Sequence, residues 1–128
     1  MYENEIDFIM NNTDSALVAF GPDTAHMTAG KCDPVKMIKK YADRVKFTHL
    51  KDITSDGVEA AGMQAWVEVY SNFRELGKGI VDFPSIFKIL DSVGYDGFLT
   101  VELDRSRFGN KESAIISMKY LKDNYKQK

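Results

Sequence analysis

Cysteine, histidine and long apolar runs are scarce in this sequence of 128 residues. Its single cysteine, Cys32, excludes a disulfide within the chain and a zinc site built from several thiolates. No apolar run approaches the roughly 20 residues that a membrane helix needs, and the acidic start of the chain does not resemble a signal peptide. We therefore expect a cytoplasmic protein with no membrane partner.

A basic charge excess is also absent. The chain has 17 Lys and Arg residues against 19 Asp and Glu residues, for a formal net charge of −2. A protein that follows nucleic-acid phosphates needs a basic groove, so we expect no nucleic-acid partner. The 44% of hydrophobic residues and the 28% of charged residues predict one globular domain over residues 1–128, with a small molecule as its ligand.

Hydrophobic patterns predict helices that alternate with strands. Apolar runs or alternation favour strands at residues 17–20, 45–50, 72–76 and 98–103, and helical spacing or capping signals favour helices at 3–12, from 33, at 82–94 and from 110. Residues 53–74 fit helical spacing, although 66–70 also alternate like a strand. Four strands, each followed by a helix, predict a parallel α/β fold.

Several packing expectations follow from the same patterns. Residues 17–20 should form a strand buried on both sides, because their apolar run is compact and unbroken. Trp66 and Phe73 should lie in the core rather than in a lid over a substrate. Asn110 should cap the last helix, whose core side should carry Ala114, Met118, Leu121 and Tyr125.

Polar side chains gather at the ends of the predicted strands. Asp23 and His26 follow the first, His49 lies near the end of the second, and Glu102 lies near the end of the last. The carboxyl ends of parallel strands meet on one face, so these groups can approach one another. Carboxylates and imidazole suit Mn²⁺, Mg²⁺, Co²⁺ or Zn²⁺, but the same residue types also orient loops at strand ends, and both interpretations stay open here.

An ordered set of short motifs spans nearly the whole chain and resembles the xylose isomerase-like sugar phosphate isomerase/epimerase family, most of all its inosose dehydratase-like branch. The motifs are Asp23-Thr24-Ala25-His26, Asp33-Pro34, Asp43-Arg44-Val45, His49-Leu50-Lys51-Asp52, Leu76-Gly77-Lys78-Gly79-Ile80-Val81-Asp82-Phe83, Gly94-Tyr95-Asp96-Gly97 and Val101-Glu102-Leu103-Asp104. The resemblance implies the C-terminal half of a TIM barrel, a parallel (β/α)₄ unit with strands five to eight.

The resemblance also implies an activity and residue roles. It predicts a divalent-metal-dependent isomerase, epimerase or dehydratase that acts on a sugar or cyclitol, with Asp23, His49 and Glu102 as ligands of Mn²⁺, Co²⁺, Mg²⁺ or Zn²⁺. Glu102 would also be a catalytic acid/base. His26 and Lys51 would bind the substrate, and Lys51 is expected to neutralise nearby carboxylates rather than form a Schiff base.

Two departures from the family pattern limit these roles. Ala25 replaces the usual glycine, and the family's fourth ligand, a glutamate on the fourth strand, is not in this sequence. A complete barrel has about 250 residues, and four strands leave two open edges, so we expect a homodimer or a missing N-terminal half-barrel as partner.

The sequence leaves open whether the chain is an enzyme by itself. A non-catalytic half-barrel that dimerises is the alternative. A relative of the abasic-site endonucleases is disfavoured by the acidic charge balance and by the presence of only two histidines.

Overall fold

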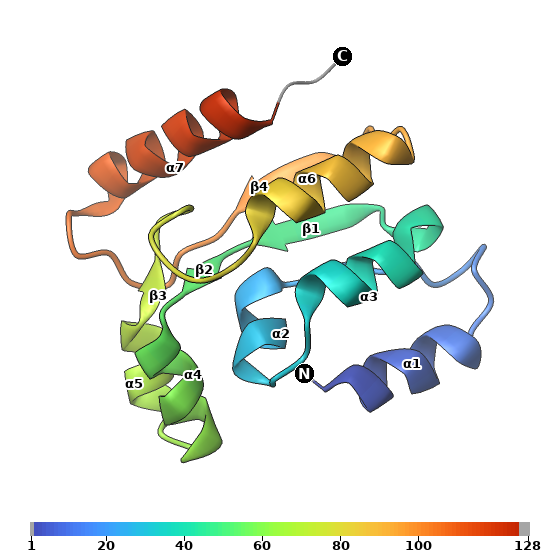
Figure 1. The fold of residues 1–128 in the computed structure, drawn as a ribbon, viewed down its shortest axis with the longest axis horizontal. Helices are drawn as coiled ribbons and strands as arrows, with labels where there is room; N and C mark the ends of the chain where they lie inside the picture. The colour runs from blue at the N-terminus through green and yellow to red at the C-terminus, as the bar shows by residue number, and fades with distance from the viewer. Residues whose placement is uncertain (1, 126–128) are drawn as a thin grey trace.

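We describe the protein from a computed structural model in which residues 2–125 are placed (Figure 1). Its elements in chain order are α1 (Glu3–Asn11), α2 (Thr24–Ala29), α3 (Pro34–Lys40), the 3-10 helix η1 (Ala42–Arg44), β1 (Phe47–Leu50), β2 (Asp52–Ile53), α4 (Ser55–Gly62), α5 (Trp66–Ser71), β3 (Phe73–Arg74), α6 (Phe83–Ser92), β4 (Phe98–Val101) and α7 (Asn110–Asn124). Among the described residues, no helix is long and apolar enough to cross a membrane.

Parallel pairing is the basis of the fold. β1 pairs with β4 in parallel, with Phe47 opposite Phe98 and Leu50 opposite Val101. On the other side of β1 the chain makes two isolated parallel bridges, Phe20 with Val45 and Asp23 with His49. The predicted mixed α/β architecture with parallel strands is confirmed.

The two faces of β1 have different surroundings. Thr48 and Leu50 are buried, whereas Phe47 and His49 on the opposite face are only partly covered. Helices α3 and α6 pack against each other and supply much of the core beside the buried face, including Ile38 from α3. Both helices begin as predicted, with Asp33 and Asp82 side chains accepting backbone N–H groups of the first turn.

The predicted strand at 72–76 differs from expectation. Its counterpart β3 has two residues and runs antiparallel to β2, with Asp52 opposite Arg74. The helical hairpin α4–α5 returns the chain to where it left β2, and a chain that reverses in this way pairs antiparallel. β4 therefore lies directly beside β1, without a parallel strand between them.

The predicted buried strand at 17–20 is wrong except at its end. Leu17 is 83% exposed, and only Phe20 is buried. The segment before Phe20 forms a turn that starts at Asp14, because the Asp14 carbonyl accepts the N–H groups of Leu17 and Val18. The Arg44 guanidinium then donates to the Val18 carbonyl, so a side chain replaces the strand partner there.

Residues 53–74 are largely helical, but their apolar side chains do not form the expected core stripe. Trp66 is 51% exposed on α5, against the prediction, whereas Phe73, in β3, is buried as predicted. Residues 24–29, for which no helix was predicted, form the short helix α2.

The last helix, α7, begins at a different cap and buries a different face from those predicted. Gly109 rather than Asn110 is the N-cap residue, with a φ of 93° that favours glycine. The buried residues are Ser113, Ser117 and Leu121, while Ala114 and Met118 are exposed. Ser113 donates to the buried Glu75 carboxylate and Ser117 accepts the Leu76 N–H, so polar contacts decide which face is buried.

A buried carboxylate holds the loop that leads into α6. Asp52 accepts hydrogen bonds from the backbone N–H groups of Ile53, Gly77, Gly79 and Val81. A Cβ atom at Gly79 would lie 2.3 Å from Asp52 Oδ1, so only glycine permits this approach. Burial raises the pKa of the Asp52 carboxyl, and the four N–H donors oppose that rise.

We expect Asp52→Asn to destabilise the protein strongly, although it keeps the size of the side chain. The NH₂ group of the asparagine would face backbone N–H groups, and two donors cannot hydrogen-bond to each other. Buried N–H groups would then be left unpaired, at a cost of about 1–3 kcal/mol for each. Chemical denaturation measures the loss of unfolding free energy. The control is Asp43→Asn at an exposed site in η1, and equal stability of the two variants would refute this role of Asp52.

Candidate metal centre

Asp23 is placed by its own helix and by the neighbouring strand. It is the N-cap of α2, where its Oδ1 accepts the His26 N–H at 2.9 Å. The next residue, Thr24, donates its hydroxyl to the Lys51 carbonyl and accepts the Lys51 N–H. These two hydrogen bonds extend the parallel contact between residues 23–24 and β1 beyond the end of the strand. They leave Asp23 Oδ2 facing the ends of the strands.

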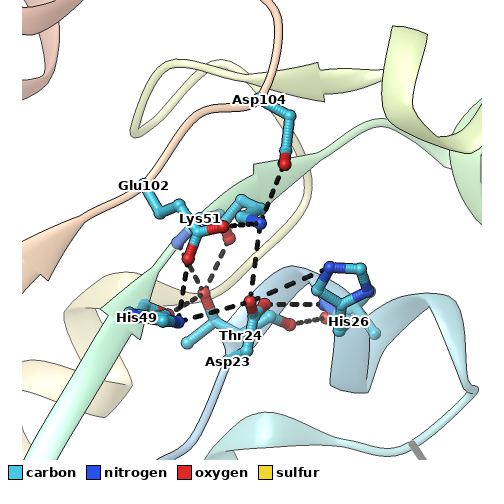
Figure 2. A network of polar contacts seen from close by, with 8 residues as sticks. Asp23, Thr24, His26, His49, Lys51, Glu102 and Asp104 are labelled. Carbon is cyan, nitrogen blue, oxygen red and sulfur yellow. Dashed lines mark hydrogen bonds and ion pairs between the residues drawn. The ribbon is translucent and has the colours of Figure 1, made fainter.

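His49 and Glu102 come from the paired strands β1 and β4. The Glu102 N–H donates to the Leu50 carbonyl, which extends the parallel pairing by one residue and fixes the backbone of Glu102. His49 Nδ1 lies 2.8 Å from Glu102 Oε2 and 3.9 Å from Asp23 Oδ2. Figure 2 shows the three side chains converging from separate chain segments.

These three residues fit a divalent cation. Each offers one ligand atom, and the three atoms lie within 4.8 Å of one another. Two ligand atoms of one ion are at most about 4.4 Å apart when each bond is about 2.2 Å, so small side-chain rotations would suffice. Two carboxylates and one imidazole without a thiolate are a ligand set for Mg²⁺, Mn²⁺, Co²⁺ or Zn²⁺.

Lys51 lies at the centre of the carboxylates. Its side chain is 1% exposed, and its Nζ is 2.6 Å from Glu102 Oε1, 2.9 Å from Asp104 Oδ2 and 3.6 Å from Asp23 Oδ2. The Nζ also lies 4.8 Å from the centre of the Phe73 ring. Burial lowers the pKa of Lys51, but the hydrogen bonds to Glu102 and Asp104 outweigh it, so the pKa is raised overall and the ammonium stays charged at neutral pH.

His26 lies at the border of the cluster. Its Nε2 is 4.0 Å from Asp23 Oδ2, and its ring packs edge to face on Phe73 and Tyr70. Its side chain is 30% exposed, so it can be reached from solvent. The structure thus brings together all five residues predicted for the site: Asp23, His26, His49, Lys51 and Glu102. Their roles stay predictions.

The sequence prediction missed Asp104 as a member of the cluster. Asp104 lies beyond the end of β4, two residues after Glu102, and extended backbone places side chains two residues apart on the same face. That spacing could have predicted its direction. The expectation that Lys51 neutralises carboxylates did not name Asp104, which is 53 residues away in the sequence.

Comparison with known proteins gives this geometry a context. The model of the xylose isomerase-like TIM barrel family matches residues 3–124. The inosose dehydratase of Clostridium beijerinckii is 36% identical over 126 residues, which cover 94% of this chain and 42% of the relative. The inosose dehydratase of Geobacillus kaustophilus is 35% identical over 105 residues, which cover 79% of this chain and 34% of that relative.

A solved structure agrees with these sequence matches. The crystal structure of a sugar phosphate isomerase/epimerase from Parabacteroides distasonis superimposes with a TM-score of 0.64 and 27% identity, over 90% of this chain and 34% of that one. The chain therefore spans less than half the length of these relatives, as the C-terminal half of a barrel would. On the extent of the family match, this chain belongs to the xylose isomerase-like TIM barrel family.

Proposed function

We propose that this chain supplies the metal-binding part of an isomerase, epimerase or dehydratase that acts on a sugar or a cyclitol. The observation that carries the proposal is the convergence of Asp23, His49 and Glu102 at the ends of parallel strands. Relatives named inosose dehydratase and sugar phosphate isomerase/epimerase support the choice of substrate class. Mn²⁺, Co²⁺, Mg²⁺ and Zn²⁺ all suit the ligand set.

The residues divide the chemistry among them. A bound divalent ion would polarise neighbouring hydroxyl and carbonyl oxygens of the substrate and so acidify the adjacent C–H group. Asp23 and His49 would fix the ion, and the Glu102 carboxylate would accept the proton from that carbon. Return of the proton to the adjacent carbon gives isomerisation and return to the opposite face of the same carbon gives epimerisation, whereas transfer of the proton to a neighbouring hydroxyl that leaves as water gives dehydration. His26 would donate a hydrogen bond to a substrate oxygen.

Metal binding should depend on one histidine and not on the other. We expect His49→Ala to remove bound divalent ion, because it deletes the only nitrogen ligand, while His26→Ala keeps it. Metal content after dialysis, measured by inductively coupled plasma mass spectrometry, distinguishes the two variants, and circular dichroism confirms that both are folded. Unchanged metal content in His49→Ala would reject the proposed site.

Proton abstraction can be measured without knowing the full reaction. We expect the metal-loaded protein to exchange the C–H next to the carbonyl of an inosose with deuterium from D₂O, and we expect Glu102→Gln to abolish this exchange. Nuclear magnetic resonance follows the loss of the C–H signal. If the wild-type chain binds metal but exchanges nothing, the non-catalytic half-barrel is the better description, as the limited coverage of the relatives would allow.

The uncovered face of the β1–β4 pair supports a second half-barrel as partner. Phe98 is 80% exposed and lies opposite Phe47, on the same face as His49. A sheet of a barrel normally buries this inner face, and burial of a phenylalanine contributes about 1.5–3 kcal/mol. We propose that another copy of this chain covers it.

Light scattering after size-exclusion chromatography tests this pairing. We expect the wild-type chain to be a dimer, and we expect Phe98→Glu to shift it towards the monomer because a carboxylate would be buried. The matched control is Phe108→Glu, at an exposed residue in the loop before α7. A folded wild-type monomer at high concentration would contradict the proposal.

A further inference from the structure

One buried ammonium is shared by three carboxylates, only two of which belong to the candidate metal site. Asp23, Glu102 and Asp104 all lie within 3.6 Å of Lys51 Nζ. Three carboxylates and one ammonium together carry a formal charge of −2. A divalent cation would balance this charge, so the cluster as a whole is matched to such an ion.

Lys51 is nevertheless a competitor for the ligands. Its Nζ holds Glu102 Oε1 at 2.6 Å and reaches Asp23 Oδ2 at 3.6 Å, and both carboxylates are candidate ligands. A cation that binds there meets the repulsion of a second positive charge close by. The side chains of Lys51 and Asp23 are only 1% and 11% exposed, so water screens this repulsion less than it would at the surface.

Asp104 lies where it can relieve this competition. Figure 2 shows it on the far side of the Lys51 ammonium from Asp23 and His49. It is not part of the ligand group of Asp23, His49 and Glu102, and its carboxylate accepts a 2.9 Å hydrogen bond from Lys51 Nζ. A negative charge in this place attracts the ammonium from the side opposite Asp23 and shares in neutralising it.

We propose that Asp104 is a positioning residue that neutralises Lys51 and thereby leaves the charges of Asp23 and Glu102 free for a divalent cation. The proposal rests on the metal site of the proposed function. In this proposal Lys51 does not act directly on the substrate. Lys51 orients Glu102, and Asp104 keeps the Lys51 ammonium from occupying the position of the ion.

The expected effect is on affinity, without loss of a ligand. Replacing a residue that supports the metal ligands without binding the ion itself typically weakens metal binding about 10–100-fold. We expect Asp104→Asn to weaken binding at least about tenfold, while Asp104→Glu, which keeps the charge, stays within about threefold of the wild-type chain. Asp96→Asn, at an exposed carboxylate in the turn before β4, controls for the loss of a charge elsewhere.

Isothermal titration calorimetry on the full chain provides the measurement. Mn²⁺, Co²⁺, Mg²⁺ and Zn²⁺ are each titrated, and the ion that binds most tightly is used for all variants. The same Asp104→Asn change is then made in a Lys51→Met background. We expect the loss of affinity to shrink to about threefold or less there, because the competing ammonium is gone.

The outcomes are distinguishable. Suppose that the wild-type chain binds the ion, but Asp104→Asn loses no affinity, or loses the same affinity with Lys51 present as with Lys51→Met. Either result would overturn the role of Asp104 and leave the metal site intact. Absence of binding by the wild-type chain would overturn both. If Lys51→Met does not fold, the contrast between Asp104→Asn and Asp104→Glu decides, since failure of the charged variant to retain affinity contradicts the proposal.

Discussion

The ammonium group of Lys51 connects every segment that contributes to the site. It is buried at the end of β1 and pairs with Asp23 at the start of α2 and with Glu102 and Asp104 after β4. A buried charge is tolerated only when it is paired and hydrogen-bonded, so the burial of Lys51 depends on these carboxylates. The backbone of the same residue is held by the Thr24 hydroxyl. One residue thus sets both the spacing of the chain segments and the charge of the cluster.

This constraint also explains why the site is open on one side. The parallel pairing of β1 with β4 carries His49 and the exposed Phe98 on one face, and residues 2–125 cover that face only in part. The buried face, in contrast, has the packing of α3 and α6 behind it. The site therefore lies on the partly uncovered face of a chain that spans less than half the length of its relatives.

Much of this arrangement could be predicted from local patterns. The helix starts at Asp33 and Asp82 depend on capping residues next to them in sequence, and both are found as expected. The Arg44 contact that replaces a strand partner at Val18 and the polar face of α7 were not predictable, because hydrogen bonds to Arg44, Glu75 and Leu76 decide them from far along the chain. Convergence of Asp23, His49 and Glu102 followed from parallel strand ends, whereas the role of Asp104 depends on a distant lysine.

The central claim is that Asp23, His49 and Glu102 hold one divalent cation beside a charged lysine. A crystal structure of the protein grown with Mn²⁺, with anomalous scattering measured to locate the ion, tests it most directly. The account predicts a single strong peak about 2.2 Å from an oxygen of Asp23, from His49 Nδ1 and from an oxygen of Glu102, with Lys51 Nζ against Asp104. An ion bound elsewhere, or Lys51 Nζ between these ligands in the presence of saturating Mn²⁺, would contradict it.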